Sequence, residues 1–411
     1  MLGGTATVTA LQGLTFLLLA RGLGPDEFGR VATANSVTAL LMPFSGLGFA
    51  NVMIMRVTRD PSALPLYLGN ALAMMLLSGG LLVFAAVGWA QLWLAAEVSF
   101  SLMVLVAISE LVASKAIDIC WHVFIAREQL HYTSQIMGTQ SASRLLFAAG
   151  YLWLSSAPDA LGWAVWSLLS NGLVALGVWL WTLRGVGRLR FDAKIARGEL
   201  SSGASFAVGI SAKGFYTEAD KMFLARFGGT EAVGHYTVAF RVVQIALAPI
   251  RALSFALQAR MYRAGQAGIH GSLGVTMRVL LPLSGAALVL GVGYYLGAPL
   301  LTWIAGDKYA GSVDVLRMLS FLPLLLAAQA LLADTLASSG HQRLAALFEV
   351  ITAILICTLC MILVPSHGWR GAAVASYVSQ GTLVLLLAIA IRRLMRNAVA
   401  VDRELSTVRS D

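Results

Sequence analysis

The chain has 411 residues, of which 58% are hydrophobic and only 12% are charged, and its mean hydropathy is +0.78. A soluble domain carries about 25% charged residues, so the composition excludes a water-soluble globular protein and predicts an all-α polytopic membrane protein. The formal net charge of +9 would suggest nucleic-acid binding in a soluble chain, but here the basic residues follow a membrane pattern, and no nucleic-acid partner is expected.

A membrane-spanning helix needs about 20 mostly apolar residues, and the sequence contains twelve such stretches. The first has no basic segment before it and no small-residue cleavage site, so we expect a span there rather than a cleaved signal peptide. The predicted spans are 2–20, 31–52, 67–92, 99–126, 134–156, 160–183, 203–225, 235–258, 274–300, 313–337, 344–364 and 369–391. None of the joints between them is long enough to hold a soluble domain.

Two stretches, LARGLGPDEFGRVATA at 19–34 and LARFGGTEAVGHYTVA at 224–239, repeat at an offset of 205 (224 minus 19). The identical pairs are Leu19 and Leu224, Ala20 and Ala225, Arg21 and Arg226, Gly24 and Gly229, Gly29 and Gly234, and Ala34 and Ala239. Such a repeat predicts a duplicated architecture. Because each half has six spans, an even number, we expect two parallel repeats around a central cavity.

The Gly-Trp pairs at 162–163 and 368–369 have nearly the same offset and are expected to open the sixth helix of each half. The predicted organisation is a first lobe at 1–183, a basic linker at 184–200, a second lobe at 201–395 and a tail at 396–411.

The basic residues predict the orientation of the chain, because Lys and Arg concentrate on the cytoplasmic side. The odd-numbered joints contain five, namely Arg21, Arg30, Arg226, Lys308 and Arg370. The even-numbered joints and the tail contain sixteen, namely Arg56, Arg59, Arg127, Arg184, Arg188, Arg190, Lys194, Arg197, Arg260, Arg263, Arg343, Arg392, Arg393, Arg396, Arg403 and Arg409. Both termini and the linker are therefore expected on the cytoplasmic side of the membrane.

Charged residues at membrane depth cost roughly 2.5–3.5 kcal/mol each on insertion scales and usually face a cavity or a partner. The seventh span carries Lys213 and Asp220 on one polar face, and the eighth carries Arg241 and Arg251 at helical spacing. For Lys213, Arg241 and Arg251 we favour a water-filled cationic cavity over structural pairing. The pair Glu218 and Lys221, three residues apart, is expected to form near the outer end of the seventh span.

In the first half, the charged residues of the spans are Glu110, Lys115, Asp118 and Arg144. Two interpretations stay open: Lys115 pairs with Asp118 structurally, or Lys115 and Arg144 join the cationic cavity. Guanidinium and ammonium groups favour an anionic substrate, and guanidinium matches phosphate oxygens bidentately. The acidic Asp118, Asp220 and Glu110 either bind a coupling cation or only neutralise their neighbours.

No cofactor or metal site is expected. Cys357 and Cys360 form a C-x-x-C pair inside an apolar run, without a second pair of metal ligands, and are expected to pack as small apolar side chains.

The stretch LLLARGLGPDEFGRVATANSVTALLMPFSGLGFANVMIMRVTR resembles the start of bacterial polysaccharide-repeat flippases, the polysaccharide-transport branch of the multidrug/oligosaccharidyl-lipid/polysaccharide exporter superfamily. The similarity lies in a Leu-Gly-Pro-acidic-acidic-aromatic-Gly turn at 23–29, followed by Gly48 and Arg56. EADKMFLARFGGTEAVGHYTVAFRVV in the second half is also similar to this family, through Asp220, Lys221 and a Gly-x-Tyr at 234–236.

This resemblance implies a flippase that alternates between inward-open and outward-open forms. Its cargo would be an oligosaccharide repeat unit on undecaprenyl diphosphate, moved from the cytoplasmic to the periplasmic leaflet for exopolysaccharide, capsule or O-antigen assembly. A proton or sodium gradient would supply energy, and a polysaccharide polymerase and a chain-length regulator would be partners.

Three alternatives remain. A peptidoglycan-precursor flippase usually has two further C-terminal helices, and a cation-coupled multidrug exporter would need an acidic cavity. A membrane polymerase or glycosyltransferase would need carboxylate clusters outside the membrane, whereas the acidic residues of the joints are scattered. The prediction is therefore a transporter and not an enzyme.

Overall fold

The computed structural model describes residues 2–94, 96–265 and 268–408, and these are helical without a β-strand. The chain forms two compact units, Met1–Gly234 and His235–Asp411. Six of the described helical segments are long and apolar enough to cross a membrane, or seven if the bent pair α12–α13 forms one span. The protein is therefore a multi-pass membrane protein, while the count of twelve spans stays a prediction.

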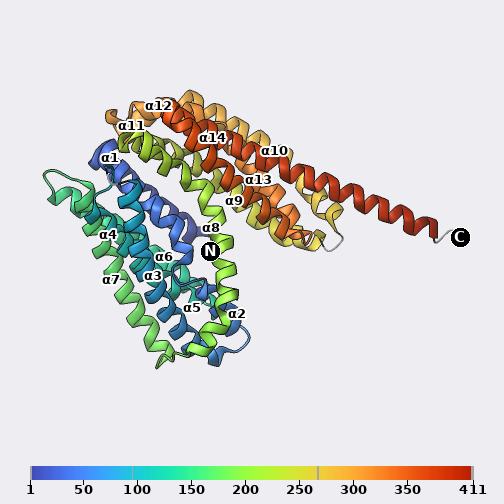
Figure 1. The fold of residues 1–411 in the computed structure, drawn as a ribbon, viewed down its shortest axis with the longest axis horizontal. Helices are drawn as coiled ribbons and strands as arrows, with labels where there is room; N and C mark the ends of the chain where they lie inside the picture. Colours follow the sequence, from blue (N-terminus) through green and yellow to red (C-terminus); the bar gives the residue numbers. More distant parts are fainter. Residues whose placement is uncertain (1, 95, 266–267, 409–411) are drawn as a thin grey trace. The chain divides into compact units, whose positions relative to one another are not determined.

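The first unit consists of eight α-helices, the start of a ninth, and three short segments (Figure 1). Their bounds are α1 Leu2–Leu41, η1 Met42–Phe44, α2 Phe49–Val57, η2 Pro61–Ala63, α3 Leu64–Trp93, α4 Phe100–Ile108, the π-helix η3 Ser109–Ser114, α5 Lys115–Ala126, α6 Leu130–Leu154, α7 Ala160–Val186 and α8 Ala193–Gly228. Helix α9, Thr230–Gly265, begins in this unit and continues into the second. A core of α2, α3, α5 and α7 residues, with Met53, Leu68, Ile119 and Val123 at its centre, holds the first unit together.

The second unit contains the remainder of α9 and five further α-helices. Their bounds are α10 Ile269–Gly297, α11 Leu300–Ala305, η4 Asp307–Tyr309, α12 Gly311–Leu319, α13 Leu322–Ser338 and α14 Gln342–Val408. The core residues Leu336, Leu383 and Leu387 join α13 to the second part of α14.

Large apolar side chains on the outer faces of both units are exposed, as expected of surfaces that lie against lipid. Leu81 and Phe84 of α3 are 70% and 78% exposed, and Leu281 of α10 is 81% exposed. These faces explain why the composition is too apolar for a water-facing surface.

Several predicted boundaries differ from the structure. The predicted span 31–52 is interrupted between Leu41 and Phe49, where Pro43 lies in a 3-10 turn and Gly46 and Gly48 have φ of 78° and 69°. The span 313–337 is bent by 41° between α12 and α13. Conversely, the ten-residue joint after span 2–20 shrinks to a break at Gly24, because Pro25 can start a helix directly after it.

Both Gly-Trp pairs lie at the start of a helix, as expected, but their glycines differ in conformation. Gly162 lies inside the first turn of α7, where its backbone N–H donates to Asp159, the N-cap of that helix. Gly368 instead is the non-helical break within α14, with a φ of 54°. The predicted linker 184–200 is also mostly helical, since α7 ends at Val186 and α8 begins at Ala193.

Candidate functional site

The two copies of the repeated motif adopt the same local structure. Gly24 has φ 77° and ψ 173°, and its counterpart Gly229 has φ 81° and ψ 165°. These angles lie in a region that is essentially restricted to glycine. Leu19 and Leu224, which precede the two breaks, are both buried. The sequence repeat therefore specifies a glycine break followed by a new helix in both halves.

The two motif copies also contact each other reciprocally within the first unit. A Cβ on Gly29 would lie 1.8 Å from the carbonyl oxygen of Thr230, and a Cβ on Gly234 would lie 1.9 Å from the carbonyl oxygen of Pro25. Gly29 corresponds to Gly234 in the repeat, and Pro25 corresponds to Thr230. The two contacts are therefore equivalent and are related by a local pseudo-two-fold rotation. This backbone-to-backbone approach requires glycine at both positions.

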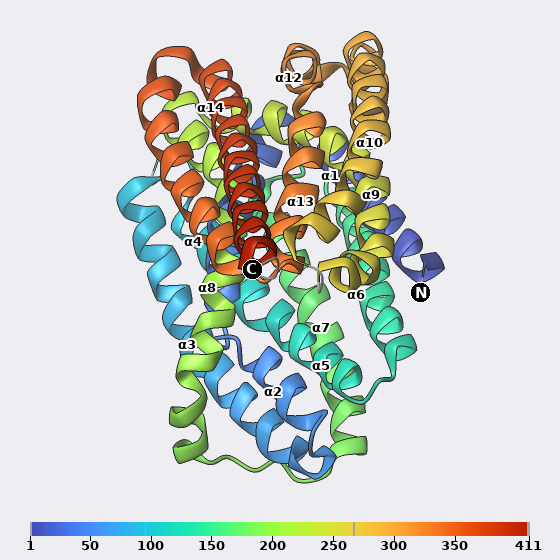
Figure 2. The same ribbon diagram turned by 90° about the vertical axis from the view of Figure 1, so that its right-hand side faces the viewer.

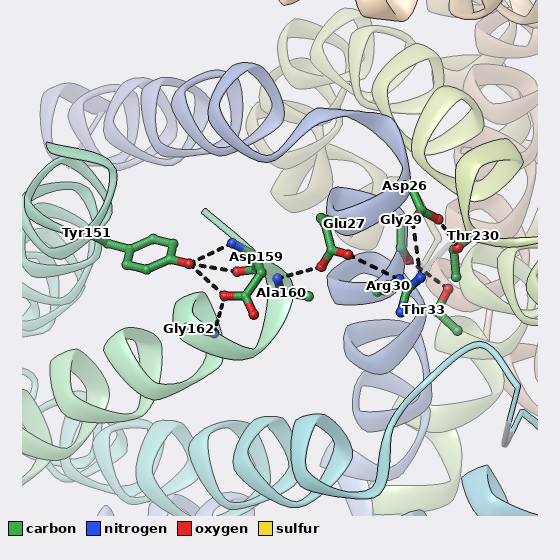
Figure 3. A network of polar contacts seen from close by, with 10 residues as sticks. All are labelled: Asp26, Glu27, Gly29, Arg30, Thr33, Tyr151, Asp159, Ala160, Gly162 and Thr230. Atoms are coloured by element: carbon green, nitrogen blue, oxygen red, sulfur yellow. Dashed lines mark hydrogen bonds and ion pairs between the residues drawn. The ribbon is translucent and has the colours of Figure 1, made fainter. Parts of the chain in front are cut away.

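Acidic residues of the same motif tie three helix starts together (Figure 3). Thr230 donates its hydroxyl to Asp26, and the backbone N–H of Ala160 donates to Glu27 at 2.7 Å. Arg30 pairs with both Asp26 and Glu27, at 3.2 and 3.5 Å. The Pro-Asp-Glu turn therefore links α1 to the N-terminal ends of α7 and α9, where the helix dipole favours negative charge.

A second polar cluster lies around the π-helix η3. Glu110 accepts a hydrogen bond from Arg144 of α6 at 2.9 Å, and the two side chains are 16% and 31% exposed. Within the described residues, this is the one polar contact of the Arg144 side chain, and it uses a single guanidinium nitrogen. The remaining guanidinium donors are available to a ligand.

Amides and hydroxyls from three elements extend this cluster. Asn171 of α7 donates to Ser109 at 3.0 Å, and Gln140 of α6 donates to Ser114 at 3.2 Å and to Asn171 at 3.4 Å. π-Helical turns in α-helices are frequent at functional sites. The cluster therefore brings η3, α6 and α7 together around the Arg144–Glu110 pair.

Lys115 and Asp118 form a structural pair, as one interpretation of the sequence expected. The Lys115 Nζ lies 2.6 Å from Asp118, and the indole N–H of Trp121 donates to the other carboxylate oxygen, also at 2.6 Å. His122 lies 3.5 Å from the same oxygen as Trp121. Asp118 is thus fully engaged by its own helix, which favours a neutralising role over cation coupling.

We expect Ser45→Ala to destabilise the first unit by about 1–3 kcal/mol, because a buried acceptor would lose its donor. The fully buried Ser45 donates its hydroxyl to the Leu111 carbonyl of the π-helix at 2.6 Å. Thermal unfolding of the purified protein measures the effect. Thr58→Ala, which removes an exposed hydroxyl bonded within its own helix, is the control and should change little; equal loss in both variants would contradict the assignment.

The acidic and basic groups at the end of α8 are also paired. Lys221 lies 2.8 Å from Glu218, as the spacing predicted, and Ser36 of α1 donates to the same Glu218 oxygen at 2.9 Å. Asp220 is 1% exposed and accepts from the backbone N–H of Lys221. The side chains of Lys213 and Arg251 lie outside the described residues. Arg241 of α9 is half-buried.

The structure therefore brings together Glu110 with Arg144 and Lys115 with Asp118, but does not test the predicted cavity residues of the seventh and eighth spans. Sequence reasoning missed Ser109 and Asn171. The signal for Asn171 was present, since it is an amide inside an otherwise apolar span.

A family model described as polysaccharide biosynthesis protein matches residues 2–258. No curated protein matches the chain. Among solved structures, an inward-facing multidrug resistance MATE family transporter of the MOP superfamily is similar at 16% identity, with 94% of this chain and 95% of that chain covered and a TM-score of 0.77. An outward-facing multidrug resistance MATE family transporter of the MOP superfamily is also similar at 16% identity, with 96% of this chain and 93% of that chain covered and a TM-score of 0.65.

A third similar structure is a MOP superfamily transporter from Pyrococcus furiosus Vc1 (DSM3638), described as having a binding pocket of reversed polarity that suggests a different function. It is 15% identical, with 95% of this chain and 94% of that chain covered and a TM-score of 0.64. At these identities the solved structures establish the fold, and the family model, which covers more than half of the chain, establishes the family. The chain belongs to the polysaccharide biosynthesis protein family and has the fold of MOP superfamily transporters.

Proposed function

We propose that this protein is a flippase for undecaprenyl-diphosphate-linked oligosaccharide repeat units. It moves them from the cytoplasmic to the periplasmic leaflet of the bacterial inner membrane by alternating access of its two lobes, for exopolysaccharide, capsule or O-antigen assembly. The observation that carries the proposal is the family match over residues 2–258. Both termini lie in the cytoplasm, and a polysaccharide polymerase and a chain-length regulator act on the delivered units.

The chemistry of the first unit supports an anionic cargo. Arg144 donates to Glu110 through one guanidinium nitrogen and has further N–H groups that can donate to a ligand. Its side chain is 31% exposed. A guanidinium group can bind two oxygens of a phosphate at once. An anionic head with an apolar tail suits a cation held at membrane depth, because the tail stays in lipid while the head is neutralised.

The proposed cargo-binding cations are Arg144, Lys213, Arg241 and Arg251. Lys115 is withdrawn from this set by its 2.6 Å contact with Asp118. Among the acidic residues, Glu110 remains as the candidate coupling group for a proton or sodium ion, because it bridges two helices rather than pairing within its own. Asp220 serves as a structural acceptor at the end of α8.

The proposal is tested with the purified protein in proteoliposomes that contain a fluorescent, short-chain polyprenyl-diphosphate disaccharide. The measurement is the rate at which probe in the inner leaflet becomes accessible to a membrane-impermeant quencher. Arg241→Ala and Arg251→Ala should each slow transfer by at least about tenfold, because each removes a charge-assisted contact of about 1.5–3 kcal/mol. Arg317→Ala is the control, since Arg317 pairs at 3.6 Å with Asp314 on its own exposed helix face.

The structural neighbours described as multidrug transporters make a cation-coupled drug exporter the second candidate. Transport of a lipophilic cationic dye, without transfer of the diphosphate probe, would favour the exporter and contradict the flippase. Transfer of a peptidoglycan lipid precursor in preference to other oligosaccharide lipids would assign the protein to that branch instead. Wild-type rates in the Arg241 and Arg251 variants would remove these residues from the site.

A further inference from the structure

The segment 187–192, between α7 and α8, runs along one end of the first unit (Figure 2). Hydrogen bonds attach it to that unit. The backbone N–H of Arg190 donates to the Pro65 carbonyl at 3.1 Å, and that of Asp192 donates to the fully buried side chain of Asn70 at 3.0 Å. A Cβ on Gly69 would lie 2.1 Å from the Arg190 carbonyl oxygen. The linker therefore has a defined path across α3.

The first unit also fastens the end of α7 from which the linker leaves. Arg127, at the C-terminal end of α5, donates to the Gly185 carbonyl at 2.7 Å. Together with the bonds at Arg190 and Asp192, this contact fixes both ends of the segment. The backbone positions from which its side chains project are therefore fixed.

Five exposed basic side chains lie in this segment and in the adjoining turns of α7 and α8, which together make up the linker residues 184–197. They are Arg184, Arg188, Arg190, Lys194 and Arg197. The acidic residues nearby are already engaged. Asp192 caps α8 by accepting from the backbone N–H groups of Lys194 and Ile195, and Glu199 is buried and pairs with Arg56 at 2.7 Å. Within residues 184–197 the five exposed cations therefore face one acidic side chain, Asp192, and the exposed charge is net positive.

An aromatic side chain stands among these cations. Phe191 is 57% exposed, although it lies in the middle of a well-anchored segment. Basic residues interleaved with an exposed aromatic ring are typical of protein segments that lie at the membrane–water boundary, where the ring enters the headgroup region and the charges meet phosphates.

We propose that the linker 184–197 is a docking surface for the headgroups of anionic phospholipids in the leaflet that it faces. The argument is charge complementarity, with five exposed cations on an anchored backbone and Asp192 as the one acidic residue among them. A segment that only sets the orientation of the chain in the membrane needs positive charge but no defined structure. This linker has a fixed backbone path, so its charges form a defined surface. The inference is independent of the cargo of the transporter and holds equally for a flippase or an exporter.

The first test is native mass spectrometry of the full-length protein, purified with an equimolar mixture of phosphatidylglycerol and phosphatidylcholine. The wild type should retain phosphatidylglycerol preferentially. The linker variant combines Arg188→Gln, Arg190→Gln, Lys194→Gln and Arg197→Gln. In this variant the ratio of bound phosphatidylglycerol to bound phosphatidylcholine should fall by at least about tenfold. Each basic side chain near an anionic surface contributes roughly fivefold in affinity, and salt weakens the combined effect.

A matched variant removes four exposed cations elsewhere, namely Arg343, Arg392, Arg393 and Arg396, each replaced by glutamine. It should keep most of the preference. An equal loss in the linker and control variants would mean that only net charge matters, and an unchanged preference in the linker variant would mean that the lipid binds elsewhere. Either result would overturn the proposal.

A second measurement uses only the wild-type protein, so its result cannot be affected by misfolding of a variant. Amide hydrogen exchange of the wild-type protein is compared in nanodiscs of phosphatidylcholine with and without phosphatidylglycerol. Exchange should slow in residues 187–192 when the anionic lipid is present, and high salt should abolish the difference because it screens the contact. Identical exchange in both nanodiscs would contradict the proposal.

Discussion

Replacing Gly29 with alanine is expected to destabilise the protein by about 3 kcal/mol, because overpacking a tight contact has costs of this order or more. The new Cβ would lie 1.8 Å from the Thr230 carbonyl oxygen, so the backbones of the two motif copies would have to separate. Thermal unfolding in detergent should show a fall of roughly 3 °C or more in the midpoint.

Gly234→Ala should have a similar effect, because its Cβ would meet the Pro25 carbonyl oxygen at 1.9 Å. The double variant should cost less than the sum of the two, since one separation accommodates both methyl groups and residues in contact are not additive. Gly13→Ala is the control in the same helix, where a Cβ meets nothing within 4 Å. It should be neutral or stabilising by about 0.5–1 kcal/mol. Full additivity of Gly29→Ala and Gly234→Ala would contradict a shared contact.

The second large effect concerns the Glu110–Arg144 pair. Arg144→Met should destabilise the protein by about 2 kcal/mol, because the Glu110 carboxylate, 16% exposed, would lose its cation. This value is below that of a fully buried pair, since Arg144 is 31% exposed and solvent screens the interaction. Adding Glu110→Gln should recover most of the lost stability, because the unpaired charge is then removed.

Transport by this double variant separates a structural role from a functional one. If Arg144 binds the anionic head of the cargo, the double variant should be stable but slower in the flipping assay by at least about tenfold than Glu110→Gln alone, which accounts for any coupling role of Glu110. Arg144→Lys, which keeps the charge but loses the planar fork, should retain intermediate activity. A stable double variant that transports at the wild-type rate would show that Arg144 serves only the packing of α6 against η3.

Local features of the sequence predicted local features of the structure well. The repeated motif predicted equivalent conformations, which Gly24 and Gly229 adopt. Helical spacing predicted the pair Glu218–Lys221 and offered Lys115–Asp118 as one of two interpretations, since residues three apart share a helix face. Composition predicted a multi-pass membrane protein, because the chain has too few charged residues to form a water-facing surface, and faces such as that of α3 are accordingly apolar and exposed.

Features that depend on contacts between distant residues could not be predicted. Glu110 and Arg144 are 34 residues apart, and Ser45 and the Leu111 carbonyl are 66 apart. The break between Leu41 and Phe49 was missed because hydropathy alone does not register the turn that Pro43, Gly46 and Gly48 permit. The Gly-Trp pairs predicted two helix starts but not their geometry, because Gly162 lies in a helical turn whereas Gly368 forms the break itself.

The flippase proposal is tested most directly by the lipid-linked intermediates of a strain from which this gene is deleted. Complete repeat units on undecaprenyl diphosphate should accumulate in the cytoplasmic leaflet, and complementation with the wild type should remove them, whereas well-expressed Arg241→Ala and Arg251→Ala should not. Finished units that already face the periplasm would indicate a polymerase, and truncated units a glycosyltransferase. The absence of any accumulation would contradict a role in moving oligosaccharide lipids.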